Sequence, residues 1–173
     1  MKNNKGFSLV ELIIVIAIMA ILVGLMAPQL IKYIEKTNVS SDIQLCDTIH
    51  TAFAIAMADP DVITATDQYS ASQIANIQSG QYAMRCAGWG DSVFTQTVNE
   101  YVGFDVFSSG DAEFLSRVKS TPAKDNGALY IQGTGGGGFV VWIYDSDVTG
   151  EKVSGNHVVN KTGITNDNVI YVE

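Results

Sequence analysis

The strongest constraint on this chain is an apolar run from Phe7 to Ala27 that contains a single charged residue, Glu11. Folded as an α-helix, the run is about 31 Å long, which matches the roughly 30 Å hydrocarbon core of a bilayer. A carboxylate in hydrocarbon costs about 3 kcal/mol, and less near a helix end. The run therefore predicts a membrane-spanning helix, and the position of Glu11 requires a physical reason.

The residues on either side of this run distinguish a cleaved secretory signal from other membrane segments. A secretory signal has a shorter apolar stretch and a small-residue cleavage site, and the residues before Pro28 offer only a poor site. Lys2 and Lys5 precede the run, and no comparable basic cluster follows until Lys32. By the positive-inside rule, we expect the N-terminus in the cytoplasm and the rest of the chain outside.

The head of the run resembles a known signal. Residues 5–12, KGFSLVEL, resemble the type III signal of the type IV pilins and pseudopilins, in which a short basic leader ends in glycine and is followed by phenylalanine, a glutamate four positions later and an apolar helix. Gly6, Phe7 and Glu11 occupy these positions. Pro28 lies where many of these proteins carry a helix proline. Because proline removes an intrahelical hydrogen bond, we expect a kink between Gly24 and Pro28.

The resemblance implies how the N-terminus is processed. In that family a membrane aspartyl peptidase, the prepilin peptidase, cuts after the glycine and methylates the new amine. Cleavage would fall between Gly6 and Phe7, and Phe7 would become N-methylphenylalanine. The close approach that a protease needs is easiest at a residue without Cβ, as Gly6 is.

Processing leaves two interpretations of Glu11 open. The carboxylate can be stabilised by its own helix N-terminus and by the Phe7 amine one turn away. Alternatively, it pairs with the Phe7 amine of a neighbouring subunit, which would set the register of assembly because an offset subunit leaves both charges unpaired.

The resemblance also implies a function. It is that of a structural subunit of a type IV pilus, which polymerises through its N-terminal helix into a surface filament for adhesion, motility or DNA uptake. The implied partners are other copies of the chain and related pilins, the prepilin peptidase, an inner platform protein, an assembly ATPase and, before assembly, the cytoplasmic membrane. Three alternatives stay open: a minor pilin or adhesin, a pseudopilin of a secretion or competence system, and a single-pass anchored binding domain that does not polymerise.

Periodicity predicts the rest of the fold. Beyond Pro28, apolar residues recur at spacings of mostly three and four as far as Met57, which predicts a continuing amphipathic helix, and Pro60 marks its end. From Gly127 the period changes to two. We expect strands at residues 128–132, 139–145, 152–160 and 168–172, and short helices at residues 91–102, with an N-cap at Asp91 or Ser92 and Gly103 as terminator, and at 111–119.

The predicted fold class is therefore α+β, a long N-terminal α-helix packed on a C-terminal antiparallel β-sheet of about four strands, as in the type IV pilin fold. The expected organisation is a leader at residues 1–6, a stalk helix at 7–58 whose first part, 7–30, spans the membrane or forms the filament core, a connecting region with short helices at 59–126, and the sheet at 127–173.

Charge and cysteine content restrict the remaining functions. The chain carries 18 acidic and 10 basic side chains, and loss of Lys2 and Lys5 with the leader would bring its formal charge from -8 to -10, so we expect no nucleic-acid partner. Cys46 and Cys86 are the two cysteines. In an exported domain they predict either a disulfide, which would close a loop of about 40 residues and stabilise the fold by about 4 kcal/mol, or two separate buried thiols.

No segment predicts catalysis or a cofactor. Asp145, Asp147 and Thr149 resemble the first half of a calcium loop, but the twelfth position is Asn156, so a polar turn is the alternative reading. The glycine-rich stretch 133–138 lacks the lysine and the following helix of a phosphate loop, which predicts a hairpin tip.

Overall fold

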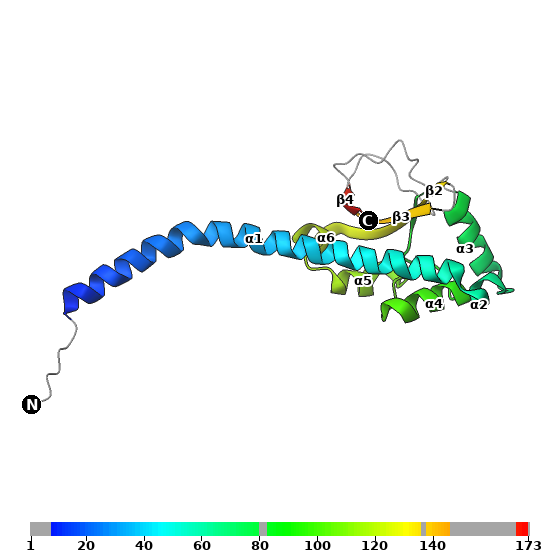
Figure 1. The fold of residues 1–173 in the computed structure, drawn as a ribbon, viewed down its shortest axis with the longest axis horizontal. Coiled ribbons are helices and arrows are strands. Elements are labelled where there is room, and N and C mark those ends of the chain that lie inside the picture. The colour runs from blue at the N-terminus through cyan, green and yellow to red at the C-terminus, as the bar shows by residue number, and fades with distance from the viewer. Residues whose placement is uncertain (1–7, 80–82, 136–137, 146–168, 173) are drawn as a thin grey trace, which may run out of the picture. The chain divides into compact units, whose positions relative to one another are not determined.

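The computed structural model describes residues 8–79, 83–135, 138–145 and 169–172. The chain divides into two units, residues 1–37 and residues 38–173, and the division falls within the first helix. The elements in chain order (Figure 1) are α1 (Leu9–Ala58), α2 (Pro60–Ile63), α3 (Gln68–Ser79), β1 (Ala83–Arg85), α4 (Val93–Val102), the 3-10 turn η1 (Ser109–Asp111), α5 (Ala112–Arg117), α6 (Thr121–Asn126), β2 (Gly127–Gly135), β3 (Gly138–Asp145) and β4 (Val169–Val172).

The second half of α1, from residue 38, is an amphipathic helix that packs on the rest of the second unit; we call this unit the body. Its inward positions follow spacings of three and four, and the side chains of Cys46, Ile49 and Phe53 are fully buried. They join one hydrophobic core with residues of β2 and β3. The helix ends at Ala58, next to Asp59, whose carboxylate accepts the backbone N–H of Asp61 at 2.8 Å and so caps α2.

The sheet has the order β1-β2-β3-β4, and every neighbouring pair is antiparallel. The glycine-rich stretch contributes residues 133–135 to the end of β2 and Gly138 to the start of β3, and these two strands pair antiparallel, as a hairpin requires. Val141 and Ile143 face the core that contains α1. On the other face Tyr130 and Trp142, opposite each other in register, are buried and stacked with ring centroids 6.1 Å apart.

β4 (Val169–Val172) corresponds to the predicted strand at residues 168–172, whereas the predicted strand at residues 152–160 lies outside the described residues. β1 (Ala83–Arg85) was not predicted, because three residues are too few to show a period of two. It exists because it pairs with β2, in the register Met84 with Ile131.

The connecting region contains α4, whose ends match the sequence signals. Ser92 is the N-cap and exchanges hydrogen bonds with Thr95 as a capping box. Gly103 ends the helix in the left-handed region at φ 83°, which a residue without Cβ adopts without strain. α5 is shorter than the predicted helix at 111–119. α3 and α6 were not predicted. The sequence shows little sign of α3 because its apolar stripe is weak: the helix meets the core mainly through Ile74 and Ile77.

Candidate functional site

The N-terminal half of α1 presents a continuous exposed apolar surface. Its large apolar side chains between Leu9 and Ile34 are each 50–73% exposed, and they lie on all sides of the helix. Among the described residues, α1 is the one helix that is long and apolar enough to span a membrane, with a mean hydropathy of 3.0 in its most apolar window, none of which is buried. A surface of this size and character is covered by lipid or by other protein in a working molecule.

Glu11 lies at the head of this surface and closes the helix N-terminus. Its Oε2 accepts the backbone N–H of Ser8 at 2.8 Å, and Ser8 directly precedes the first residue of α1. This is the carboxylate half of a capping box, which satisfies one of the free amides at a helix start. The Ser-x-x-Glu spacing from Ser8 to Glu11 was a sequence signal of this contact that the predictions above missed.

Gly6 and Phe7 lie outside the described residues, so cleavage, methylation and the pairing of Glu11 with an amine stay predictions. The helical assignment of α1 runs unbroken through Gly24 and Pro28, and the kink there also stays a prediction.

A buried carboxylate ties α1 to the connecting region. Asp42 is 1% exposed and accepts three hydrogen bonds, from the backbone N–H groups of Lys119 at 2.8 Å and Ser120 at 2.9 Å and from the Ser120 hydroxyl at 2.5 Å. Ser120 is the N-cap residue of α6. Asp42 was not singled out from the sequence, although a charge four residues before Cys46, on the apolar stripe of the helix, is a usable signal.

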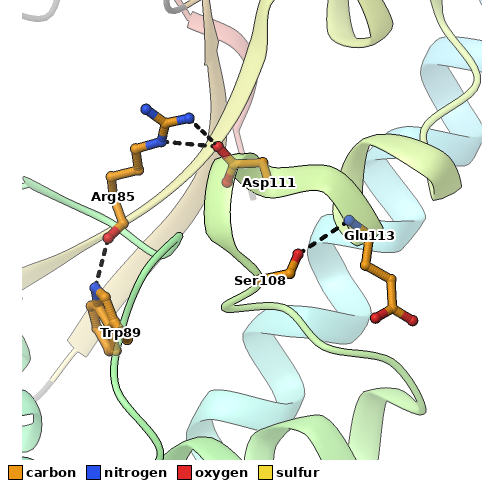
Figure 2. Close-up of polar contacts among 5 residues, drawn as sticks. All are labelled: Arg85, Trp89, Ser108, Asp111 and Glu113. Carbon is orange, nitrogen blue, oxygen red and sulfur yellow. Dashed lines mark hydrogen bonds and ion pairs between the residues drawn. The ribbon is translucent and has the colours of Figure 1, made fainter.

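An ion pair holds β1 to the segment before α5 (Figure 2). Arg85 donates from Nε and Nη2 to Oδ2 of Asp111, at 2.9 and 2.5 Å, and Asp111 is fully buried. Burial raises the pKa of the Asp111 carboxyl, against the lowering effect of the Arg85 guanidinium. The same close-up shows Trp89 donating from Nε1 to the carbonyl of Arg85 at 2.6 Å, and Glu113 donating its N–H to the Ser108 hydroxyl. These contacts are structural, since they join backbone segments within the body.

In the structure both cysteines are free thiols, and both are buried. Burial raises the pKa of the Cys46 thiol to about 12, helped by the nearby Asp42 and Asp47 carboxylates. Burial also raises the pKa of Cys86, helped by Asp111 and Cys46. Both groups are therefore protonated at neutral pH.

The calcium candidate is only partly within the described residues. Asp145 is the last residue of β3, and Asp147 and Thr149 lie outside the described part of the chain. Within that part, no group of three or more His, Cys, Asp or Glu side chains could hold a metal ion.

Comparison with known proteins places these features in a family. The prokaryotic N-terminal methylation motif matches residues 1–27. The type IV major fimbrial protein FimA of Dichelobacter nodosus is 37% identical over 81 residues, 47% of this chain and 50% of that protein, so the chain spans about half the length of this relative. The type IV narrow pilus major component PilA5 of Thermus thermophilus is 30% identical over 104 residues, 60% of this chain and 84% of that protein.

The most extensive of these alignments is with the type IV wide pilus major component PilA4 of Thermus thermophilus, which is 30% identical over 132 residues, 75% of this chain and 93% of that protein. No solved structure matches the chain. The methylation motif lies where α1 begins, and α1 packs on an antiparallel sheet, as the resemblance implied. By motif, by fold and by an alignment that covers nearly all of a relative, this chain belongs to the type IV pilins.

Proposed function

We propose that this chain is the main structural subunit of a type IV pilus. The observation that carries the proposal is the exposed apolar half of α1, with a methylation motif at its head. Before assembly, membrane lipid would cover this surface. In a filament, the apolar halves of α1 from neighbouring copies would cover it. The named relatives are major pilus or fimbrial components, which favours a major subunit over a minor pilin or a pseudopilin.

Assembly follows from the chemistry of the two parts of the chain. Each subunit would be inserted with its N-terminus inside, cut by the prepilin peptidase between Gly6 and Phe7, and drawn out of the bilayer by the platform protein and the assembly ATPase. Contacts between stalk helices are heterologous and do not close into a ring, so they build a helical fibre. The acidic body would then form the outer surface of the filament.

Glu11 would act at the step in which a subunit joins the fibre. In the isolated chain its carboxylate accepts the Ser8 N–H, so the helix start alone supplies one partner. Processing would add the amine of Phe7, from the same chain or from a neighbour. A neighbour's amine would neutralise both charges in the apolar filament core only when the subunits are in register.

The test is the composition and the N-terminus of purified surface filaments. We expect this chain to be their dominant protein, and mass spectrometry of the filament protein to show that it begins with N-methylated Phe7. A chain that is trace or absent in the filaments would contradict the assignment as main subunit. A chain with an intact Met1 would contradict the processing step.

A further inference from the structure

The two cysteines of the chain lie on elements that pack together. Cys46 is on the inward face of α1, and Cys86 directly follows β1 and donates its backbone N–H to the carbonyl of Leu129 in β2 at 2.9 Å. Both side chains are fully buried, and both belong to one hydrophobic core.

The turn that contains Cys86 contacts the face of α1 that contains Cys46. The Trp89 N–H donates to the Cys86 carbonyl at 3.4 Å, and the Trp89 ring meets the Phe53 ring edge-on at a centroid distance of 6.2 Å. Phe53 is seven residues after Cys46, two helical turns along the same face. The effect of Cys46 on the pKa of Cys86 also requires that the two groups are near each other in space.

We propose that Cys46 and Cys86 form an intramolecular disulfide in the exported protein, which staples the stalk helix to the first strand of the sheet. The proposal rests on the proposed function in one respect: the body must lie outside the cytoplasm, where disulfides form and persist. It goes beyond that function because polymerisation through the N-terminal half of α1 does not require the bond.

The chemistry is a thiol–disulfide exchange with an exported disulfide carrier as oxidant. One cysteine, as thiolate, attacks the carrier's disulfide to give a mixed disulfide, and the second cysteine then displaces the carrier sulfur. Two thiols lose two protons and two electrons and form one S–S bond, and the carrier disulfide takes them up and leaves as a dithiol.

Burial determines when this exchange takes place. In the closed body both thiols are out of reach of a carrier and both have raised pKa values, so little thiolate is available. The bond therefore forms before the core closes around the cysteines. Once formed, it is shielded from reductants by the same core.

The test counts thiols in the full chain taken from cells. One sample is denatured in the presence of a thiol alkylator, and a second is denatured and reduced before it is alkylated, and the intact mass and N-terminus of both are measured. We expect no alkyl group on the monomeric chain without reduction and two after reduction, and a proteolytic digest should contain a linked pair of peptides with Cys46 and Cys86.

Three results would overturn the proposal, and they separate it from the proposed function. Two alkyl groups without reduction, on a chain that begins at methylated Phe7 in filaments, overturn the bridge and leave the pilus assignment intact. The same result on an unprocessed chain inside the cell contradicts both. A disulfide-linked dimer on a non-reducing gel shows that the cysteines pair between copies.

A stability measurement provides a second readout. Cys46→Ala, Cys86→Ala and the double variant should each lower the Tm of the full chain in detergent, by about 10 °C, and equally, because each removes the same bond. The losses should largely disappear when the variants are compared with reduced wild type, which controls for the change in core packing. Additive losses that persist under reduction would show that the cysteines act only as core residues.

Discussion

The carboxylate of Asp42 offers the sharpest test of how the stalk helix is held to the body. Replacing Asp42 with Asn keeps the size of the side chain but turns one acceptor oxygen into an NH₂ donor. That donor would then face the N–H groups and hydroxyl that now donate to Asp42. Leaving a buried donor unsatisfied costs about 1–3 kcal/mol, and hydrogen bonds to a charged group are worth about 1.5–3 kcal/mol. We expect Asp42→Asn to lower the free energy of unfolding by about 3 kcal/mol.

The measurement is thermal unfolding of the full chain in detergent, followed by the fluorescence of Trp89 and Trp142, which are both within the body. For a chain of this size the loss corresponds to a fall in Tm of about 6–12 °C. Asp47→Asn is the matched control, because Asp47 is on the exposed face of the same helix and the change in charge is the same.

The control should change stability by less than about 0.5 kcal/mol. Ser120→Ala, which removes only the hydroxyl donor, should cost about 1 kcal/mol. If Asp42→Asn is no more destabilising than Asp47→Asn, the three hydrogen bonds do not hold α1 to α6, and the reasoning is wrong.

Three further variants test the other contacts. Glu11→Gln should keep the hydrogen bond from Ser8, and the variant should be inserted and cleaved normally. It should assemble poorly, because the side chain lacks the charge that pairs with the Phe7 amine. Filaments in normal amount from that variant alone would rule out the charge pair as the determinant of register. Arg85→Met should cost about 2 kcal/mol at pH 7, less than a fully buried pair because the Arg85 side chain is 42% exposed. The loss of stability in Arg85→Met should shrink in acid. The pKa of Asp111 is raised by burial, so its unpaired carboxylate is protonated in the folded variant as pH falls through that pKa. If urea titrations show the same loss of stability down to pH 4, the unpaired charge of Asp111 is not its cause. Gly103→Ala should cost about 1 kcal/mol, because the residue has a positive φ, and Gly90→Ala, where φ is not positive, is the comparison.

Local signals in the sequence determined α1, the ends of α4 and the pairing of β2 with β3. The apolar run predicts α1, and Ser92 and Gly103 mark the ends of α4, because hydropathy period and capping act between residues close together in the chain. The same is true of the hairpin between β2 and β3. The odd position of Glu11 was evident from the sequence, and its partner Ser8, three residues away, was also within reach of local reasoning.

Tertiary structure alone decided which residues hold the body together. The donors to Asp42 are 77 and 78 residues away in the chain, and Asp111 is 26 residues from Arg85, so no local period or motif identifies either partner. β1 is a strand only because β2 lies beside it. Long-range contacts of this kind depend on the closed core, which brings together segments that are far apart in the chain. The local sequence of one such segment does not indicate which other segment it contacts.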